Sequence, residues 1–281
     1  MAGAHPDRAV LEAVLDLAAR APSPRNSQPW RWQVDDAGLH LHADWSRAVA
    51  DSGAGRRDVL ISCGAVLDHC TVALAAEGWR PHVRRFPTLD DPGHIALFEV
   101  IEHPAQPGTR ELAAAIGSRR SDRREFPEAR LPAGTLELLS VHAARRGVDF
   151  AVVPRTRWGR DERGEVALRF PGRAVGDRSA NADGAVLLTL GTAGDDEIDR
   201  VRAGETLSHL LLAATALELA SCALTDPLHD GRNRLALGCE VFDGESYPQV
   251  LIRVGAAPET PQAPGGSDRR SLQQTTTWTS N

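Results

Sequence analysis

The order of hydrophobic and polar positions near the start of the chain predicts a helix followed by a hairpin. Over 7–20, apolar side chains recur at intervals of three and four, as on one face of a helix, and Asp7 is placed to act as its N-cap. Apolar and polar residues then alternate over 30–34 and 39–43, on either side of the turn-forming sequence DDAG. This arrangement predicts a β-hairpin.

The middle of the first half is an almost continuous apolar segment. It predicts a long helix over 57–77 that ends at Gly78 in the C′ position. Two more strands are expected over 81–86 and 95–101, because turn-forming residues cluster at 90–93 between them.

The second half begins with helices near 109–118 and 132–146 and a strand over 148–153. From 154 to 184 the Gly- and Arg-rich sequence has no clear period, so we expect a mobile loop or lid there. The regular elements expected after it are a buried strand over 185–191, a long helix over 204–222, a short helix around 232–237 and a strand over 248–255, followed by a polar tail.

Both halves contain helices, short strands and one long Ala- and Leu-rich helix followed by a strand. Because hairpins replace a regular βαβ alternation, the pattern predicts an α+β fold with central long helices and antiparallel or mixed sheets. The similarity of the halves suggests a loose internal duplication, with one half-domain over 1–104 and the other over 105–281.

The composition indicates the cellular compartment of the protein and the partners it is expected to lack. The 281 residues, 42% of them hydrophobic, can bury a large core, and the four cysteines form no CxxC pair. Cys63 and Cys70 lie seven apart in a helical pattern, so both are expected as buried thiols in a reducing compartment. No signal pattern is found at the N-terminus, and the apolar stretch 210–224 is interrupted by Glu218. We therefore expect a soluble cytoplasmic protein without a membrane partner.

The charged residues exclude some binding partners and one type of catalytic chemistry. The net charge of −6 argues against a nucleic-acid partner or an anionic membrane. Every basic residue other than histidine is arginine, which excludes lysine Schiff-base chemistry and makes every cationic contact to a phosphate a guanidinium contact.

The common catalytic motifs are missing from the sequence. It contains no GxSxG, HExxH or GxxxxGK[ST], and the Gly-Ala-Gly sequence at 53–55 lacks the third glycine of a dinucleotide-binding loop. The histidines do not pair with cysteines or carboxylates at metal-ligand spacing. His40 and His42 alternate with leucines on a strand and are expected to face solvent, while His69 and His209 are expected in packing or surface positions. We predict no metal site and name no catalytic acid or base.

The segment RRSDRREF at 119–126 permits two interpretations. It can be the start of a solvated helix, with Asp122 and Glu125 as a capping box, and taken alone this interpretation is favoured. It can also be a phosphate site at the mouth of a helix, because guanidinium groups and the Ser121 hydroxyl are convergent donors for a dianion.

The loop APSPRNSQPWRWQV, which begins at Ala21, also permits two interpretations. It can be a stiff proline-rich turn whose tryptophans fill the core, which is the better interpretation of the loop alone. It can instead present Ser, Asn and Gln donors and acceptors to the edge of a flat polar heterocycle.

These two segments resemble the motifs of a known family. The loop is similar to the PSxxNxQPW signature of the nitroreductase superfamily, and RRSDRREF to its RRSxR phosphate motif. In ordinary members RRSxR comes first, whereas here it follows the loop by about a hundred residues. The chain thus resembles the two-half, Acg-like branch, as do GRRDVLISCGAVLDHCTVAL, RAGETLSHLLLAATALELASCALTDPL, PQVLIRVG and SDRRSL.

The resemblance implies a nitroreductase-like α+β fold made of two fused half-domains, a pseudo-dimer within one monomer, that binds one FMN. Ordinary members are homodimers that take the two motifs of each site from different subunits. The loop would lie along the isoalloxazine edge, and the arginine motif with the late arginine pair would hold the phosphate and ribityl chain. The FMN-binding residues that it implies are Pro22, Ser23, Pro24, Asn26, Gln28, Arg119, Arg120, Ser121, Arg123, Leu224, Thr225, Asp226, Arg269 and Arg270.

The resemblance implies an FMN-dependent oxidoreductase that takes hydride from NAD(P)H and reduces a small electron-poor acceptor such as a nitroaromatic or a quinone. Two other functions stay open. One is a flavin-sequestering or storage protein with little turnover, and the other is an oxygen-using dehydrogenase that matures a natural product.

Overall fold

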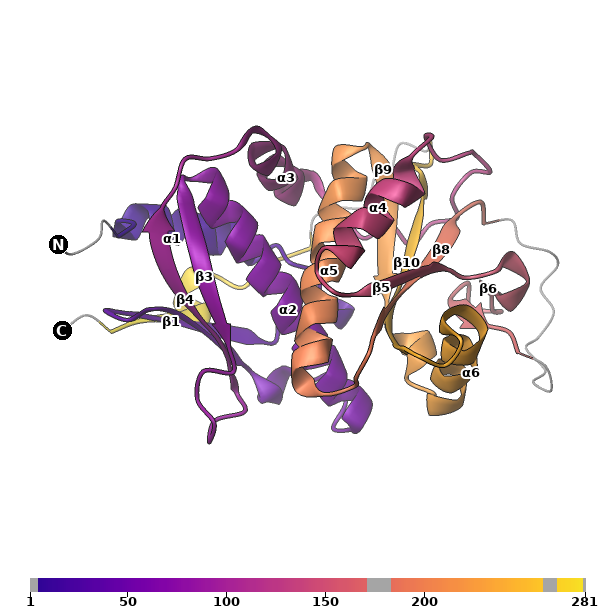
Figure 1. Ribbon diagram of the computed structural model, residues 1–281, viewed down its shortest axis with the longest axis horizontal. Helices are drawn as coiled ribbons and strands as arrows, with labels where there is room; N and C mark the ends of the chain where they lie inside the picture. The colour runs from indigo at the N-terminus through magenta and orange to yellow at the C-terminus, as the bar shows by residue number, and fades with distance from the viewer. Residues whose placement is uncertain (1–4, 171–182, 260–266, 280–281) are drawn as a thin grey trace. The chain divides into compact units, whose positions relative to one another are not determined.

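The structure is a computed structural model that describes residues 5–170, 183–259 and 267–279 (Figure 1). The chain forms two compact units that are interleaved along the sequence. Unit 1 consists of Met1–Arg119, Arg200–Leu212 and Ser267–Asn281, and unit 2 of Arg120–Asp199 and Ala213–Gly266. The division into half-domains 1–104 and 105–281 stays a prediction, because compactness and internal duplication are different properties.

Unit 1 is built on a mixed five-stranded sheet of strand order β11-β1-β2-β4-β3. Neighbouring strands are antiparallel except β1 and β11, which are parallel. The predicted hairpin and the two later strands are confirmed, with small shifts at their ends. The strands are β1 (Trp30–Asp35), β2 (Gly38–Ala43), β3 (Trp79–Arg85), β4 (His94–Glu102) and β11 (Thr276–Trp278).

The helices of unit 1 begin and end where their capping residues allow. Helix α1 (Arg8–Ala18) has Asp7 as its N-cap, as predicted, and the Asp7 carboxylate accepts a hydrogen bond of 2.8 Å from the Val10 amide. Helix α2 (Gly53–Ala76) starts earlier than predicted because Ser52 caps it, and Gly78 follows it with φ of +86°. Helix α3 is Pro107–Ser118.

Among the described residues, α2 is the one helix long and apolar enough to cross a membrane. Of its most apolar 18-residue window, 83% is buried in the protein, as in a core helix.

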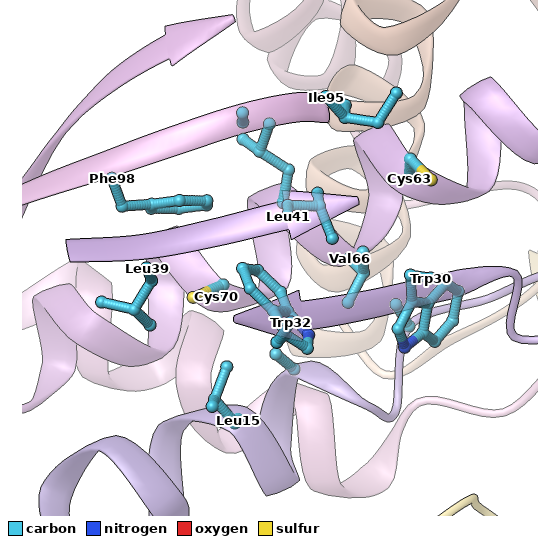
Figure 2. Packing of buried hydrophobic residues seen from close by; sticks show 14 of the residues in the cluster. Leu15, Trp30, Trp32, Leu39, Leu41, Cys63, Val66, Cys70, Ile95 and Phe98 are labelled. Carbon is cyan, nitrogen blue, oxygen red and sulfur yellow. The ribbon is translucent and has the colours of Figure 1, made fainter. Parts of the chain in front are cut away.

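The main core of unit 1 lies between the sheet and helices α1 and α2 (Figure 2). Trp30 and Trp32 of β1 are both buried, and the Trp32 ring lies 5.6 Å from that of Phe98, centroid to centroid. Cys63 and Cys70 are free and buried on α2, which confirms the prediction, and burial raises the pKa of both thiols. The loop before β1 is therefore anchored at its end by a large buried ring.

The backbones of α2 and α5 (Glu197–Ala216) touch in unit 1 through two glycines. A Cβ on Gly64 would lie 2.0 Å from the Val201 carbonyl oxygen, and one on Gly204 would lie 2.0 Å from the carbonyl oxygen of Ile61. Real Cβ atoms do not approach a backbone oxygen so closely, so both positions require glycine. This approach brings the polar side chains of the two helices within hydrogen-bonding distance.

Unit 2 is built on an antiparallel four-stranded sheet of strand order β5-β8-β10-β9. At its centre, Arg253 of β10 is 1% exposed and forms an ion pair of 2.6 Å with the equally buried Asp183. With its two predominantly antiparallel sheets and its long helices, the chain confirms the predicted α+β class. The elements are β5 (Asp149–Val152), β8 (Val186–Thr192), β9 (Leu219–Leu224), β10 (Tyr247–Ala256), α4 (Thr135–Ala144) and α6 (Gly231–Phe242).

The prediction of a mobile loop or lid over 154–184 is wrong for its first part. Strands β6 (Trp158–Arg160) and β7 (Val166–Leu168) form an antiparallel hairpin there, and Trp158 and Leu168 are buried in the core of unit 2. Strands of three residues are too short to give a recognisable alternation, which is why the sequence pattern did not reveal them. The rest of the segment, 171–182, lies outside the described residues.

The long helix predicted over 204–222 is wrong at both ends. Helix α5 begins at Glu197, after a capping box formed by Asp196 and Asp199, and ends at Ala216. Glu218 has φ of +60°, in the left-handed region, and the chain then continues as β9. The partly buried β9 has the same Ala- and Leu-rich composition as the helix, so periodicity did not mark the boundary.

The polar tail also contains regular structure. Residues Leu272–Thr275 form one helical turn, α7, and β11 then pairs with β1 through Trp32 and Thr276. A short strand without apolar alternation gives no signal in the sequence. Its pairing holds the late arginines beside the loop that precedes β1.

Candidate functional site

The loop between α1 and β1 has an unusual backbone. Arg25, Asn26 and Gln28 have φ of 51°, 56° and 47°, a region that residues with side chains rarely adopt. The Ser23 hydroxyl accepts a hydrogen bond of 3.0 Å from the Gln28 amide and closes the turn, while Pro22 and Pro24 restrict the backbone before it. Such strain persists only where the surrounding structure imposes it, and it is common at functional sites.

Arg269 contacts this loop from the C-terminal segment. One terminal nitrogen of the Arg269 guanidinium donates to the Asn26 side-chain oxygen at 2.6 Å, and the other donates to the Arg20 carbonyl at 3.3 Å. The Asn26 amide nitrogen donates in return to the Asp268 carbonyl at 2.8 Å. The side-chain oxygen and nitrogen of Asn26 thus both engage the C-terminal segment.

Arg270 is fastened to the same loop through Gln28. The Gln28 side-chain oxygen accepts from the Arg270 amide at 2.9 Å, and the Arg270 guanidinium donates to the carbonyls of Gln28 and Trp30 at 3.1 and 3.2 Å. Burial lowers the pKa of Arg270, as does the charge of Arg47, and Asp44, whose carboxylate lies 3.9 Å away, opposes both. Gln28 therefore fixes the loop to the C-terminal segment as well as leading into β1.

Arg119 reaches the same place from the end of α3. It is only 4% exposed, and its guanidinium donates to the Arg20 carbonyl at 3.0 Å. Arg119 and Arg269 thus point terminal nitrogens at one carbonyl oxygen. We call Asn26, Gln28, Arg119, Arg269 and Arg270 the loop cluster. Its hydrogen-bond donors suit a dianion, because an anion stabilises positive charges that lie so close together.

A neutral histidine lies beside these two arginines. His69 of α2 is completely buried, with its Nδ1 2.7 Å from the Ser208 hydroxyl, and Ser208 donates to Asp68 at 2.7 Å. Burial first, and the positive charge of Arg119 next, lower the pKa of His69 to about 3. The potential around the loop cluster is therefore positive without a protonated histidine.

In unit 2, the residues that follow Arg119 run beside β9. Ser121 forms a parallel bridge with Ser221, and the Asp122 amide donates to the Ser221 carbonyl at 2.9 Å. Ser121 and Arg123 are exposed and Arg120 is half-buried. We call residues 120–126 the exposed run, because the side chains of Ser121 and Arg123, two of its three predicted ligand-binding residues, face solvent within unit 2.

The predicted helix start at this segment is wrong. The exposed run is extended rather than helical, and Asp122 does not cap a helix but binds the guanidinium of Arg124 at 2.6 Å. Burial raises the pKa of Asp122, but the hydrogen bonds and charge of Arg124 outweigh it and hold that pKa below its usual range. The functional alternative also loses its helix N-terminus, so any anion bound by the exposed run is held by side chains and extended backbone.

The third predicted group lies at the end of β9. Leu224 is the last residue of the strand, and Asp226 begins a short 3-10 turn, Asp226–Leu228. Leu224 and Thr225 are each 7% exposed, whereas Asp226 is exposed. Ser221 and Leu224 are three residues apart on one strand, which corresponds to about 10 Å. The end of β9 and the exposed run therefore belong to one region of unit 2.

The structure groups the predicted FMN residues in two places. In unit 1, Arg119 and Arg269 of the loop cluster meet at the Arg20 carbonyl, and Pro22, Ser23 and Pro24 shape the loop. In unit 2, Arg120, Ser121 and Arg123 lie near the strand that leads to Leu224, Thr225 and Asp226. The assignment of all these residues to one FMN stays a prediction.

Sequence reasoning missed the residues that support the loop cluster. The Arg20 and Asp268 groups that take part are backbone carbonyls, which no side-chain motif reveals. Burial raises the pKa of Asp44, but hydrogen bonds from Arg31 and Ser46 outweigh it and keep that pKa low, so Asp44 stays ionised near Arg270. An aspartate directly after the predicted strand 39–43 was the one available signal.

Comparison with known proteins identifies the family. No protein-family model matches the chain. It is 36% identical over 320 residues to "Putative NAD(P)H nitroreductase Rv3131" of Mycobacterium tuberculosis, an alignment that covers 97% of this chain and 92% of that protein. It is 32% identical over 325 residues to "Putative NAD(P)H nitroreductase acg" of the same organism, with 94% of each covered.

A solved structure confirms the fold. The crystal structure of "a putative nitroreductase from Anabaena variabilis" matches with a TM-score of 0.60 at 13% identity, over 91% of this chain and 90% of that one. At this identity the likeness concerns the fold alone, and the near-complete sequence matches establish the family. The chain belongs to the nitroreductase superfamily, in the branch that contains the mycobacterial acg protein.

Proposed function

We propose that this protein binds FMN and acts as an NAD(P)H-dependent oxidoreductase on small electron-poor acceptors such as nitroaromatics and quinones. Its membership of the nitroreductase superfamily supports this function, as do the names of its relatives. When bound, FMN supplies the redox chemistry, accepting hydride from the nicotinamide and passing electrons to the acceptor.

The observation that carries the proposal is the meeting of Arg119 and Arg269 at the Arg20 carbonyl. Their guanidinium groups donate to one oxygen at 3.0 and 3.3 Å, beside a strained loop that is fixed by its own side chains. Concentrating positive charge in this way is unfavourable unless an anion shares the donors. We assign Arg119 and Arg269 to the FMN phosphate.

The other predicted residues then have distinct tasks. Pro22, Ser23, Pro24 and Asn26 hold the loop that would follow the edge of the flavin ring, and Gln28 with Arg270 keeps the loop in place. Arg120, Ser121 and Arg123 add donors for the phosphate and ribityl chain, and Leu224–Asp226 present backbone groups to the ring. Because the flavin carries the chemistry, these residues bind and orient it, and none is assigned as a general acid or base.

The direct test is the absorbance spectrum of the FMN-reconstituted protein before and after anaerobic addition of NADPH or NADH. Loss of the oxidised flavin bands, followed by their return when a quinone or nitroaromatic is added, is the expected result. Steady-state oxidation of NAD(P)H with the same acceptors gives the turnover. Bound FMN that no nicotinamide reduces would contradict the enzymatic function and favour the flavin-sequestering alternative.

A matched pair of variants tests the residue assignment separately. Arg269→Ala removes a guanidinium of the loop cluster, and Arg110→Ala removes an exposed arginine from α3, the helix that Arg119 follows. A hydrogen bond to a charged group is worth about 1.5–3 kcal/mol, so Arg269→Ala should weaken FMN binding at least tenfold. Arg110→Ala should leave it unchanged. Equal affinities in the two variants would remove the phosphate assignment from Arg269.

A further inference from the structure

Three histidines meet on the sheet of unit 1, and none of them is among the residues assigned to FMN. His40 and His42 are two apart on β2, so both project from the face opposite Leu39 and Leu41, which are in the core. His94 begins β4 and is paired with His42 across the two strands. We call these three residues the histidine cluster.

The ligand atoms of the histidine cluster are close enough to share one ion. One nitrogen from each ring lies within 4.8 Å of the other two, and His40 Nδ1 is 3.1 Å from His94 Nε2. Tetrahedral zinc binds imidazole nitrogen at about 2.0–2.1 Å, which places neighbouring ligand nitrogens ~3.3 Å apart. The observed 3.1 Å between two ring nitrogens therefore matches an edge of such a tetrahedron.

The far nitrogens of two rings are already held by oxygen atoms. His40 Nε2 lies 3.1 Å from the Asp35 carboxylate, and His94 Nδ1 lies 3.0 Å from the Thr88 hydroxyl. Metal-bound histidines are commonly oriented in this way, by a carboxylate or other oxygen on the nitrogen that does not bind the metal. This arrangement directs His40 Nδ1 and His94 Nε2 toward each other.

His42 completes the set when its ring rotates. Its ring is stacked on that of His94, with 4.4 Å between centroids and 15° between planes, and its Nδ1 lies 3.9 Å from the Asp91 carboxylate. Metal bonds lie in the plane of an imidazole ring, so the ring of His42 must turn about its side-chain bonds to bind the same ion as His94. The His42 side chain is 30% exposed, so part of it borders solvent rather than packed protein.

We propose that His40, His42 and His94 bind one divalent transition-metal ion of the class that prefers imidazole, represented by Zn²⁺. Three neutral nitrogen ligands suit Zn²⁺, Co²⁺, Ni²⁺ and Cu²⁺ and are unsuitable for Mg²⁺ or Ca²⁺, which require oxygen. The ion ties β2 to the start of β4, with Asp35 and Thr88 orienting two of the ligands. This metal site is independent of the proposed flavin function.

Cobalt gives the most direct test because its d–d absorption reports nitrogen coordination. Tag-free protein, freed of metal with a chelator, is titrated with Co²⁺ and then with Zn²⁺. We expect visible bands that saturate at one Co²⁺ per chain and disappear when Zn²⁺ displaces it, and a thermal midpoint that rises with Zn²⁺. A spectrum identical to that of Co²⁺ in buffer, with no Zn²⁺-dependent rise of the midpoint, would overturn the proposal.

Variants localise the ion. His40→Gln with His94→Gln should abolish the bands and the Zn²⁺-dependent stabilisation, while His82→Ala, which removes an exposed histidine of β3 in the same sheet, should retain both. If the double variant does not fold, His42→Gln alone tests the same ligand set, with a loss of at least about a hundredfold expected. Retention of one tightly bound Co²⁺ in whichever variant folds would overturn the assignment.

The carboxylate of Asp35, which orients His40, allows a test in which metal affinity is expected to fall without being lost. Asp35→Asn keeps an acceptor for the turn amide of Ala37, which Asp35 binds at 2.9 Å, but removes the charge beside His40. Loss of such an orienting group typically weakens metal binding by about 10–100-fold. An unchanged Co²⁺ affinity in this variant would contradict the role given to Asp35.

Discussion

The loop cluster and the exposed run carry the two motifs that resemble those of the nitroreductase superfamily, yet they are organised in opposite ways. In the loop cluster, Arg269 binds Asn26, Arg270 binds Gln28, and all three arginines donate to backbone carbonyls. Arg119 is 4% exposed. In the exposed run, Ser121 and Arg123 face solvent, and the carboxylate partner of Arg123, Glu165, is 3.4 Å away and equally exposed. One region is largely buried and hydrogen-bonded in the protein without ligand, whereas two of the predicted binding side chains of the other face solvent.

The difference suggests how binding free energy is divided. Donors held in place before binding lose little conformational entropy when the ligand arrives, whereas exposed arginine side chains must be immobilised. We therefore expect substitutions in the loop cluster to affect both folding and FMN binding, and substitutions in the exposed run to affect FMN binding alone.

The largest expected effect lies at the anchor of the loop cluster. Trp30→Ala removes a ring that is 0% exposed, and such truncations cost about 3–5 kcal/mol of stability. Urea unfolding of the flavin-free protein measures this loss. Leu89→Ala is the control, because Leu89 is 99% exposed and should change stability by less than ~0.5 kcal/mol. A loss of under 1 kcal/mol in Trp30→Ala would mean that the loop is not anchored by this ring.

The next largest effect is a dependence of stability on pH, which comes from the buried His69 beside the loop cluster. The pKa of His69 is about 3 in the folded protein, below its ordinary value of 6.5, so the unfolded chain binds the proton more readily. Stability contributed by neutral His69 is therefore complete above pH 6.5 and is lost as the pH falls toward 3. Between pH 6.5 and 4 we expect a loss of about 3 kcal/mol from this group, since one pKa unit corresponds to ~1.4 kcal/mol.

The His69 contribution is measured by difference, because carboxylates titrate in the same range. Unfolding free energies of the wild type and of His69→Gln are compared at several pH values from 7 to 4. The gap between the two proteins should shrink as the pH falls. A gap that stays constant would show that His69 is not held neutral by burial and by Arg119.

The contrast between the loop cluster and the exposed run is tested by the stability of one variant from each, measured without flavin. Arg119→Ala should cost about 1–3 kcal/mol of unfolding free energy, because it removes a buried donor from the Arg20 carbonyl. Arg123→Ala should cost less than ~0.5 kcal/mol, since exposed ion pairs contribute little. Thermal melts of both variants measure the difference. Equal losses would mean that the exposed run is also a structural network.

The smallest effect measures cooperation within the loop cluster. Asn26 and Arg269 are in direct contact at 2.6 Å, so their truncations should not be additive in FMN-binding free energy. A double-mutant cycle with Asn26→Ala and Arg269→Ala should give a coupling of about 0.5–3 kcal/mol. A cycle with Asn26→Ala and Arg110→Ala is the control and should be additive within ~0.5 kcal/mol. Additivity in both cycles would contradict the cluster.

Much of the fold could be predicted from the sequence where periodicity was long enough. The helix capped by Asp7, the hairpin after Trp30 and the helix ended by Gly78 follow from alternation and capping chemistry, and all are present. The hairpin around Trp158 and the strand β11 are too short to show a period. Strand β9 shares the composition of the helix before it, so the sequence did not separate them.

The sequence motifs named the side chains of the candidate site, whose role in binding FMN stays a prediction, but they did not indicate its geometry. The loop and arginine motifs identified Asn26, Gln28 and Arg119, but nothing in them indicated that Arg119 would be buried or that the Arg20 carbonyl would receive two guanidinium groups. The histidine cluster was missed for a similar reason. His94 is far from His40 and His42 in sequence, and only strand pairing brings the three together.

The central claim is that arginines of this chain hold the phosphate of one FMN, and a single titration tests it directly. Flavin-free protein is titrated with FMN and, separately, with riboflavin, which lacks the phosphate, and quenching of flavin fluorescence is followed against chain concentration. We predict one FMN per chain and riboflavin binding weaker by about a hundredfold or more, because several charge-assisted hydrogen bonds of ~1.5–3 kcal/mol each are lost. Equal affinity for the two flavins, or two FMN per chain, would contradict the account.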